Sequence, residues 1–294
     1  MSSDAFIEGA HFLADRHPAD SVGYKALARA TSDLAAMGAR PRFFLLTLAL
    51  PSERTGRWLD EFLAGLRRAA RQLGMTLIGG DTTRSPMIFI SVTVGGDIAP
   101  GRFTPRSGAR PGDLIFVTGT LGAAQLGLLV LKNLSGKAID RHLAPPFSPL
   151  RAHLYPHIPL HWGAWLARHR LASAMIDVSD GLSSDLGRLC ARSGVGARIW
   201  AERIPCVQIP ARRAGKTLSA FRPLEMALHG GEDYELLFTV SPHKLRRLRR
   251  APHFSELSEI GEVVPGRQLT LICDDGAARP LVPSGWDPFR KKKK

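Results

Sequence analysis

The chain has 294 residues, of which 44% are hydrophobic and 22% are charged, and its formal net charge is +14 at pH 7. These proportions are close to those of globular proteins, so they exclude wholesale disorder, and the length allows two domains. The longest apolar run, residues 43–50, is far shorter than the ~20 residues of a membrane-spanning helix.

Two further features concern the compartment. The first residues, 1–4, show neither the basic region nor the apolar region of a signal peptide. The three cysteines, Cys190, Cys206 and Cys273, have no metal-like spacing and are typical of small core residues in a reducing compartment. We therefore expect a cytoplasmic protein without membrane contacts.

Helices and strands alternate in the first part of the chain. Apolar residues recur at helical spacing over residues 21–38 and 52–73, and each of these stretches ends near a glycine. Apolar runs predict strands over the ranges 42–50, 76–79 and 87–94, with a loop over 81–86. The alternation predicts an α/β (α+β) fold, and it carries no glycine fingerprint of a dinucleotide-binding domain.

Residues 96–113, rich in glycine, proline and arginine, are the expected boundary between two mixed α/β domains, 1–112 and 113–294. Beyond this boundary we expect strands at 114–118, 172–178, 234–240 and 257–264, and helices at 123–132, 182–192 and after Ser241. Residues 134–160 are predicted to be irregular. Their histidines at 153, 157 and 161 are assigned to a polar surface loop rather than a zinc site, because prolines interrupt the helical spacing.

Short acidic clusters are scattered along this basic chain. They lie at residues 3–4, 32–34, 79–83, 177–181 and 230–234. Each sets a carboxylate beside glycine, serine or threonine, where the backbone can turn tightly and offer N–H groups to a phosphate. Mg²⁺ prefers oxygen ligands and usually takes one or two carboxylates together with substrate phosphates. The recurrence of the clusters therefore predicts a site for Mg²⁺ and a phosphate-bearing substrate.

Each cluster alone also fits a structural role. Residues 177–181 fit a helix N-cap, residues 79–83 a Gly-Asp turn between strands, and Asp33 a solvated helical side chain. Glu232 and Asp233 precede an apolar strand, so one of them could be functional and the other a cap.

The basic excess has two interpretations, attraction of anionic partners or an arginine-rich solvated surface. We favour the second, because no aromatic residues interleave with the basic runs at 244–250 and 291–294 and no nucleic-acid motif accompanies them. We therefore expect no nucleic-acid partner.

An ordered set of motifs extends over nearly the whole chain, at residues 24–28, 32–39, 78–84, 106–113, 117–122, 175–182 and 230–237. Together they resemble the thiamine-monophosphate kinase family of the aminoimidazole-ribonucleotide-synthetase-like superfamily. The resemblance implies an enzyme that uses ATP and Mg²⁺ to phosphorylate thiamine monophosphate to thiamine diphosphate. It also implies two α/β domains and a homodimer whose N-terminal domains build a shared β-barrel.

The resemblance also assigns site residues. It implies metal ligands at Asp4, Asp33, Asp81, Asp177 and Asp180. It implies ATP contacts at Gly80, Asp81, Arg106 and Ser179, and substrate contacts at His11, Glu232 and Trp286. No catalytic general base is expected, because the nucleophile is a substrate phosphate oxygen whose second pKa of about 6 leaves it ionised at neutral pH.

The chain departs from the family pattern at several places. It starts after the position of the family's Gly-Asp-Asp-Ala segment, and Ala5 and Ala30 replace an expected threonine and asparagine. The family's Arg-Pro-x-Pro-Arg segment is reduced at residues 155–159. One alternative expectation is a shortened form that binds nucleotide or thiamine phosphate with weak turnover or none. The others are a sibling enzyme with another substrate and, from charge alone, a nucleic-acid-binding protein.

Overall fold

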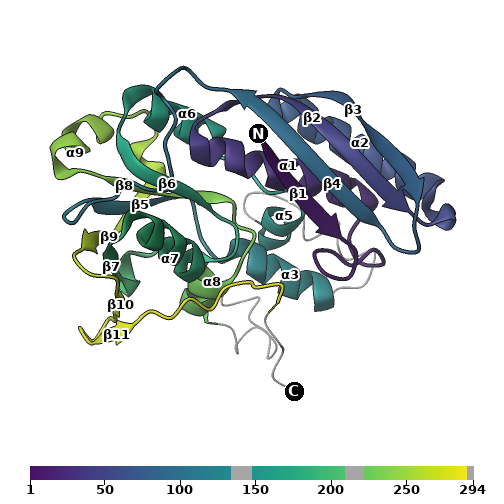
Figure 1. The fold of residues 1–294 in the computed structure, drawn as a ribbon. Helices are drawn as coiled ribbons and strands as arrows, with labels where there is room; N and C mark the ends of the chain where they lie inside the picture. The colour runs from purple at the N-terminus through teal and green to yellow at the C-terminus, as the bar shows by residue number, and fades with distance from the viewer. Residues whose placement is uncertain (134–147, 209–221, 290–294) are drawn as a thin grey trace. The chain divides into compact units, whose positions relative to one another are not determined.

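The computed structural model describes residues 1–133, 148–208 and 222–289 (Figure 1). In these residues the strands form a four-stranded sheet and a seven-stranded sheet. The chain divides into two compact units, of which the first comprises Met1–Phe103 and Gly127–Arg168 and the second Thr104–Leu126 and His169–Lys294. Both units mix helices and strands, so the predicted α/β class is confirmed.

The first unit is built on the four-stranded sheet. Its order is β1 (Ser2–Ile7), β4 (Phe89–Asp97), β2 (Arg40–Leu50) and β3 (Thr76–Arg84). Strands β2 and β3 are parallel and the other pairs antiparallel. Helix α1 (Ala19–Met37) packs against β1, β2, β4 and α2 (Arg57–Leu73), and Figure 1 shows both helices behind the sheet. The alternating apolar residues Phe44, Leu46 and Leu48 of β2 are buried, as one core-facing side of a strand requires.

The predicted loop at 81–86 was wrong for its first four residues, because β3 continues to Arg84. Pairing with β2 extends from Phe43 with Thr76 to Leu50 with Arg84, so the polar residues gain the ladder hydrogen bonds of a strand. Gly79 and Gly80 lie within this strand rather than in a turn. Gly80 has φ 154°, and a Cβ there would lie 1.8 Å from the Leu46 carbonyl oxygen, so the close approach of β2 requires glycine.

The prediction of an irregular surface stretch was wrong at α5 (Pro149–Leu154). Ser148 caps this helix by accepting a hydrogen bond from Arg151 N, and Pro149 suits the first turn because its missing N–H is not needed there. His153 is fully buried. Its Nε2 lies 3.1 Å from His17 Nε2 and its Nδ1 lies 3.3 Å from Lys25 Nζ. Helix α6 (Leu160–His169) follows.

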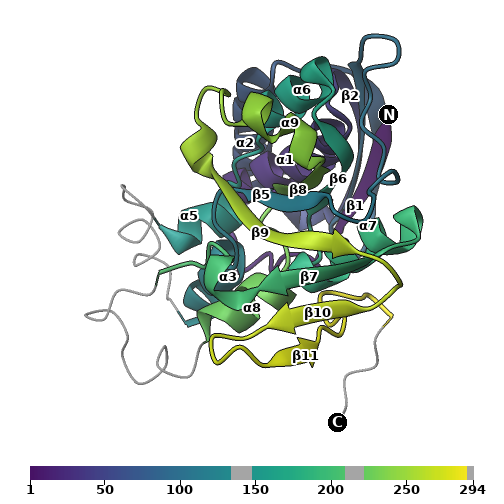
Figure 2. The ribbon, with the colours of Figure 1, turned by 90° about the vertical axis from the view of Figure 1, so that its left-hand side faces the viewer.

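The second unit is built on the seven-stranded sheet, whose order is β11-β10-β7-β9-β5-β8-β6. The strands are β5 (Leu114–Thr118), β6 (Ala172–Val178), β7 (Gly196–Trp200), β8 (Glu235–Val240), β9 (Leu257–Val264), β10 (Leu269–Ile272) and β11 (Ala278–Pro280). Figure 2 shows β9, β7, β10 and β11 in succession. Among the described residues this unit also has helices α7 (Leu182–Ser193), α8 (Pro223–His229) and α9 (Pro242–Leu248) and short 3₁₀ turns at Ala201–Arg203 and Phe254–Glu256. Helix α3 (Ala123–Asn133) begins in this unit and ends in the first unit, which also has a 3₁₀ turn at Ser52–Arg54.

Helix α7 shows why this unit holds its shape. Leu182, Leu186 and Leu189 recur at helical spacing and are fully buried in the core that β5, β6 and β8 share. All three cysteines are free thiols. Cys190 of α7 is buried, as expected for a small core residue, whereas Cys206 and Cys273 are only partly buried. None of the helices in the described part of the chain has the length and apolar character needed to cross a membrane.

Candidate functional site

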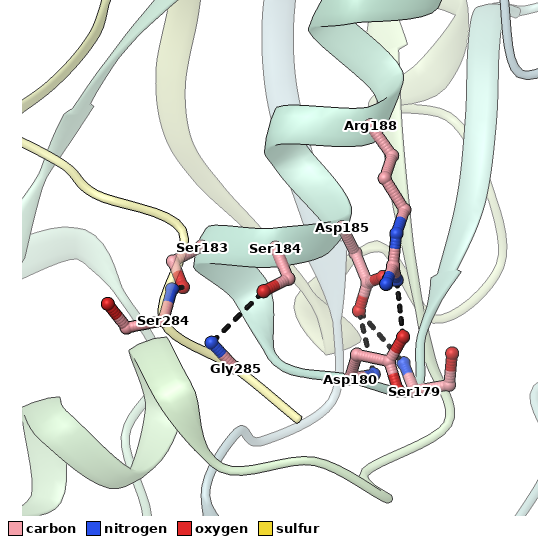
Figure 3. A network of polar contacts seen from close by, with 8 residues as sticks. All are labelled: Ser179, Asp180, Ser183, Ser184, Asp185, Arg188, Ser284 and Gly285. Carbon is pink, nitrogen blue, oxygen red and sulfur yellow. Dashed lines mark hydrogen bonds and ion pairs between the residues drawn. The ribbon is translucent and has the colours of Figure 1, made fainter. Parts of the chain in front are cut away.

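A sharp turn joins β6 to α7 and carries Ser179 and Asp180 (Figure 3). Gly181 makes the turn possible, because its φ is 109° and a Cβ there would lie 2.9 Å from the carbonyl oxygen of Gly230. The predicted motifs at residues 177–181 and 230–234 meet at this turn of the second unit.

Backbone hydrogen bonds tie distant segments to the same turn. Tyr234 N donates to Val178 O at 2.8 Å, Glu232 N to Ser179 O at 2.8 Å, and Trp286 N to Asp180 O at 2.9 Å. The structure therefore brings together the predicted residues Asp177, Ser179, Asp180, Glu232 and Trp286. Asp177, the penultimate residue of β6, is buried, whereas Asp180 is partly exposed.

The segment at 230–234 is held in a strained conformation. Glu232 has φ 73° and Tyr234 has φ 53°, a left-handed region that costs a non-glycine residue roughly 1–2 kcal/mol. Such strain persists only where the surroundings impose it, and it concentrates at functional sites. The turn at 178–180 imposes it here through the two hydrogen bonds from this segment.

Asp233 has a structural role. Its carboxylate accepts hydrogen bonds from Gly122 N at 2.7 Å and Ala124 N at 3.1 Å, and so caps α3. Burial raises the pKa of Asp233 to about 7, against the lowering effect of these hydrogen bonds. Of the two neighbouring acids, Glu232 therefore remains the candidate for ligand contact.

Asp185 and Arg188 of α7 were missed by the sequence interpretation. The buried Asp185 carboxylate accepts from Ser179 N at 3.1 Å and Asp180 N at 3.0 Å through Oδ2 (Figure 3). Arg188 Nη1 lies 2.6 Å from Asp185 Oδ1 and 2.5 Å from Asp180 Oδ2. Burial raises the pKa of Asp185 to about 6. The available signal was an acidic residue in the first turn of a predicted helix.

This arrangement corrects one expectation about the turn. Backbone N–H groups at 179–181 were expected to be available for a phosphate, but those of Ser179 and Asp180 donate to Asp185. Phosphate contact at this turn would therefore depend on side chains, such as the Ser179 hydroxyl, rather than on these two amides.

The C-terminal segment is held against the start of α7. Ser284 N donates to Ser183 Oγ at 3.2 Å and Gly285 N to Ser184 Oγ at 3.0 Å, the latter drawn in Figure 3. Trp286 is consequently fixed beside the turn with 36% of its surface exposed. A pocket of about 690 Å³ opens here, within the size range of small-molecule sites. Its lining includes Arg188, Arg267, Leu269, Leu281 and Trp286.

Arg106 lies along the edge strand of the same unit. The carbonyl oxygen of the preceding Pro105 accepts a hydrogen bond from Met175 N at 3.0 Å. Met175 lies two positions before Asp177 on β6, and Arg106 is exposed. Arg106 is therefore an exposed residue beside the strand that carries Asp177.

In the first unit, Asp4 and Asp33 face the same side of β1. Asp4 Oδ2 forms an ion pair with Arg29 Nε of α1 at 3.1 Å, and Ser2 of β1 donates a hydrogen bond to Asp33 of α1. His11 lies in the turn after β1, where its Nδ1 accepts a hydrogen bond from Ile7 N at 3.1 Å. A neutral His11 therefore carries its proton on Nε2.

Gly80 and Asp81 lie on the other edge of that sheet. Asp81 is level with Thr47, Ser91 and Ala5 across the strands, so it is three inter-strand spacings, about 14 Å, from β1. Residues at one level point to one face, whereas Asp4, the neighbour of Ala5, points to the other. A single chain thus does not bring Asp81 to Asp4.

Side chains that could bind a metal ion do not form a cluster in the described part of the chain. Across the described ranges 1–133, 148–208 and 222–289, no group of three or more His, Cys, Asp or Glu side chains is arranged to hold a metal ion.

Two domain families match the sequence. AIR synthase related protein, N-terminal domain, matches residues 1–98, and AIR synthase related protein, C-terminal domain, matches residues 110–274. The thiamine-monophosphate kinase of Salmonella typhimurium is 44% identical over 244 residues, which cover 82% of this chain and 70% of that protein. The thiamine-monophosphate kinase of Aquifex aeolicus is 34% identical over 294 residues, covering 98% and 87%.

Solved structures give the same relationship. The structure of AaThiL complexed with AMPPCP and TMP has a TM-score of 0.83 and 33% identity, covering 98% of this chain and 86% of that one. Thiamine-monophosphate kinase from Stenotrophomonas maltophilia has a TM-score of 0.79 and 35% identity, covering 95% and 85%. The hydrogenase maturation protein HypE in complex with ATP, at 21% identity, shares the fold alone.

Proposed function

Because the chain belongs to the thiamine-monophosphate kinase family of AIR synthase related proteins and is a kinase, we propose that it transfers a phosphoryl group from ATP to thiamine monophosphate. The observation that carries the proposal is the convergence of Asp177, Ser179, Asp180, Glu232 and Trp286 on one turn. It supplies carboxylates, a hydroxyl and an aromatic ring beside a pocket of ligand size.

The donor set at the turn fits a hard divalent cation. Among the described residues, Arg188 forms an ion pair with the Asp180 carboxylate at Oδ2, and no hydrogen bond or ion pair engages Oδ1. We propose Asp177 and Asp180 as Mg²⁺ ligands from the second unit, and Asp4, Asp33 and Asp81 from the first. Bound Mg²⁺ would neutralise the phosphates of both substrates and so lower the repulsion between them.

The chain's own groups then bind and orient the substrates. Arg106 and the Ser179 hydroxyl contact the donor phosphates, together with Gly80 and Asp81. Trp286 stacks on a ring of thiamine, and His11 and Glu232 contact the same substrate. No side chain needs to remove a proton, because the attacking phosphate oxygen is ionised at neutral pH. Alignment of the two phosphates is therefore the main contribution of these residues.

We further propose that the enzyme is a homodimer. Every residue of β3 is exposed, including Leu77 at 48% and Ile78 at 58%, and an unpaired edge strand with apolar side chains favours pairing. The four-stranded sheet has β1 at one edge and β3 at the other. Pairing β3 with the partner's β1, twice about a two-fold axis, would close the two sheets into a barrel and bring Asp81 towards the partner's opposite edge.

The test is an assay of the purified chain with thiamine monophosphate, ATP and Mg²⁺, with thiamine diphosphate separated by chromatography. We expect thiamine diphosphate and ADP in equal amounts, and none when Mg²⁺ is chelated. Thiamine itself and other phosphomonoesters serve as a panel that separates this activity from that of a sibling enzyme. Binding of thiamine monophosphate in a calorimeter without any product would instead support the non-catalytic alternative.

A further inference from the structure

Arg188 bridges two carboxylates with one nitrogen atom. Its Nη1 lies 2.5 Å from Asp180 Oδ2 and 2.6 Å from Asp185 Oδ1, and Figure 3 shows the guanidinium between the two acids. The two carboxylates differ in their surroundings, because 30% of the Asp180 side chain is exposed but only 1% of that of Asp185. Arg188 thus links a buried acid to one that faces solvent.

Asp185 provides the fixed end of this link. Its Oδ2 accepts the two backbone N–H groups of Ser179 and Asp180, while its Oδ1 binds Arg188. Leu182, Leu186 and Leu189 of the same helix are fully buried and hold it in place. The buried Asp185 carboxylate therefore has little freedom to move. The position of the guanidinium is therefore set from the core side.

The consequence falls on Asp180. Arg188 engages its Oδ2, and the backbone atoms of Asp180 are held as well, with N donating to Asp185 and O accepting from Trp286 N at 2.9 Å. With backbone and one oxygen fixed, the direction of the other oxygen, Oδ1, is fixed too. A metal-binding carboxylate is often oriented by such an outer hydrogen-bonded group.

We propose that Arg188 is a positioning residue for Asp180: it binds Oδ2 and so fixes the direction of Oδ1, the oxygen that would be left to hold a divalent cation. Asp185 acts as its anchor. This inference rests on the proposed function in one respect, namely that Asp180 is a metal ligand. Arg188 lies outside the predicted set of metal ligands. The inference assigns its guanidinium the role of orienting Asp180, not of competing with the metal ion for that carboxylate.

The test measures metal binding by the full chain without turnover. Mn²⁺ is titrated into the protein in the absence of nucleotide, and free Mn²⁺ is followed by electron paramagnetic resonance. We expect Arg188→Met to weaken Mn²⁺ binding about 10–100-fold, the usual effect of removing a group that orients a metal ligand. Arg188→Lys should recover part of the affinity, because an ammonium group can still bind Asp180 Oδ2.

Arg198→Met is the matched control. Arg198 lies in the same unit, is half-exposed like Arg188, and pairs with a different acid, Glu262 at 3.1 Å. We expect its loss to leave Mn²⁺ affinity unchanged. In an Asp180→Asn background, Arg188→Met should have no further effect on Mn²⁺ binding, because the residue through which it acts is already gone.

Kinetics give a second readout. In Arg188→Met the Mg²⁺ concentration for half-maximal rate should rise, while kcat at saturating Mg²⁺ changes little. Tighter Mn²⁺ binding by Arg188→Met would overturn the inference, since it would mean that Arg188 competes with the cation. So would unchanged affinity, an equal loss in the Asp180→Asn background, or no Mn²⁺ binding by the unsubstituted chain. Mn²⁺ binding without thiamine diphosphate formation would reject the proposed function and leave this inference standing.

Discussion

The two units place their predicted metal carboxylates in different ways. In the second unit, one turn gathers Asp177 and Asp180 and fixes Glu232 and Trp286 against them by backbone hydrogen bonds. In the first unit, regular strands and a helix carry the carboxylates, and β1 and β3 hold Asp4 and Asp81 at opposite edges of the sheet.

The two units therefore illustrate two ways of positioning the residues of a site, at a turn and on a sheet. A turn can bring distant parts of a chain together because each part contributes its own backbone hydrogen bonds to it. A sheet keeps its residues at fixed spacings, so carboxylates on its two edges can meet only if the edges themselves meet. The second unit's contribution should therefore survive in an isolated chain, whereas the first unit's should depend on a partner.

The largest expected effect is at the turn. Asp180→Asn should lower kcat/KM for thiamine monophosphate roughly 10²–10³-fold, corresponding to about 3–4 kcal/mol of lost transition-state stabilisation. Steady-state kinetics measure it. Asp275→Asn, an exposed acid of the same unit that pairs with Arg279 at 3.8 Å, should leave the rate unchanged. An equal loss in both variants would point to a general defect rather than to the turn.

The first unit's dependence on a partner is tested at β3. Ile78→Lys should weaken dimerisation about 100-fold or more, because burying an unpaired ammonium group at an interface costs several kcal/mol. Sedimentation velocity measures the association, and activity should fall at protein concentrations where dimers are lost. Val282→Lys replaces an equally exposed apolar residue of the second unit and should change neither. A monomeric but fully active Ile78→Lys chain would contradict the edge-pairing proposal.

Strand geometry at the first unit's predicted nucleotide contact can be tested separately. Gly80→Ala should destabilise the fold by about 3 kcal/mol, because the new Cβ would meet Leu46 O at 1.8 Å and φ is 154°. Gly74→Ala, with φ 65° and open space around its Cβ, should cost only about 1–2 kcal/mol. Urea unfolding measures both. Equal costs would show that β2 and β3 do not approach as closely as described.

The fold of the second unit also buries carboxyl groups, and their burial predicts that the stability of the fold depends on pH. Burial raises the pKa of Glu235 from 4.5 to about 7, while the hydrogen bond from Thr118 Oγ1 at 2.5 Å opposes the shift. The folded state then holds its proton more tightly than the unfolded state, so the stability contributed by Glu235 is lost as pH rises through about 7.

Glu235→Gln should therefore flatten the fall in stability between pH 4.5 and 7, an effect on the order of 1–3 kcal/mol. Denaturant unfolding at several pH values measures it. Glu259→Gln, a half-exposed acid on β9, is the control and should keep the slope of the unsubstituted chain. An identical pH slope in Glu235→Gln would show that Glu235 titrates alike in both states.

The sequence predicted best where a local rule decides the structure. Helix α1 was expected over 21–38 and is Ala19–Met37, and β6 and β9 have their predicted bounds, because apolar periodicity and flanking glycines set them. The turn at 177–181 was predicted for the same local reason. Its polar motif follows an apolar strand directly.

The sequence predicted least where the structure of a segment depends on its pairing with distant parts of the chain. Strand β1 and residues 81–84 of β3 are polar, and only their ladders with β4 and β2 make them strands. The burial of His153 depends on contacts with His17 and Lys25, more than 100 positions away. Likewise, the contacts of Asp185 and Arg188 with the turn at 179–180 depend on the folded structure and could not be predicted from the sequence. The predicted Lys291–Lys294 tail lies outside the described residues.

The hydrogen bonds that hold the C-terminal segment on α7 also bear on the order of folding. Ser284 and Gly285 each meet a serine 101 positions earlier in the chain. Closing so long a loop costs entropy that is recovered only after α7 and its sheet exist. The turn with Asp180 should therefore form first and the segment with Trp286 dock last. During refolding, the change in the fluorescence of Trp286 should therefore occur after helical and sheet structure has been recovered.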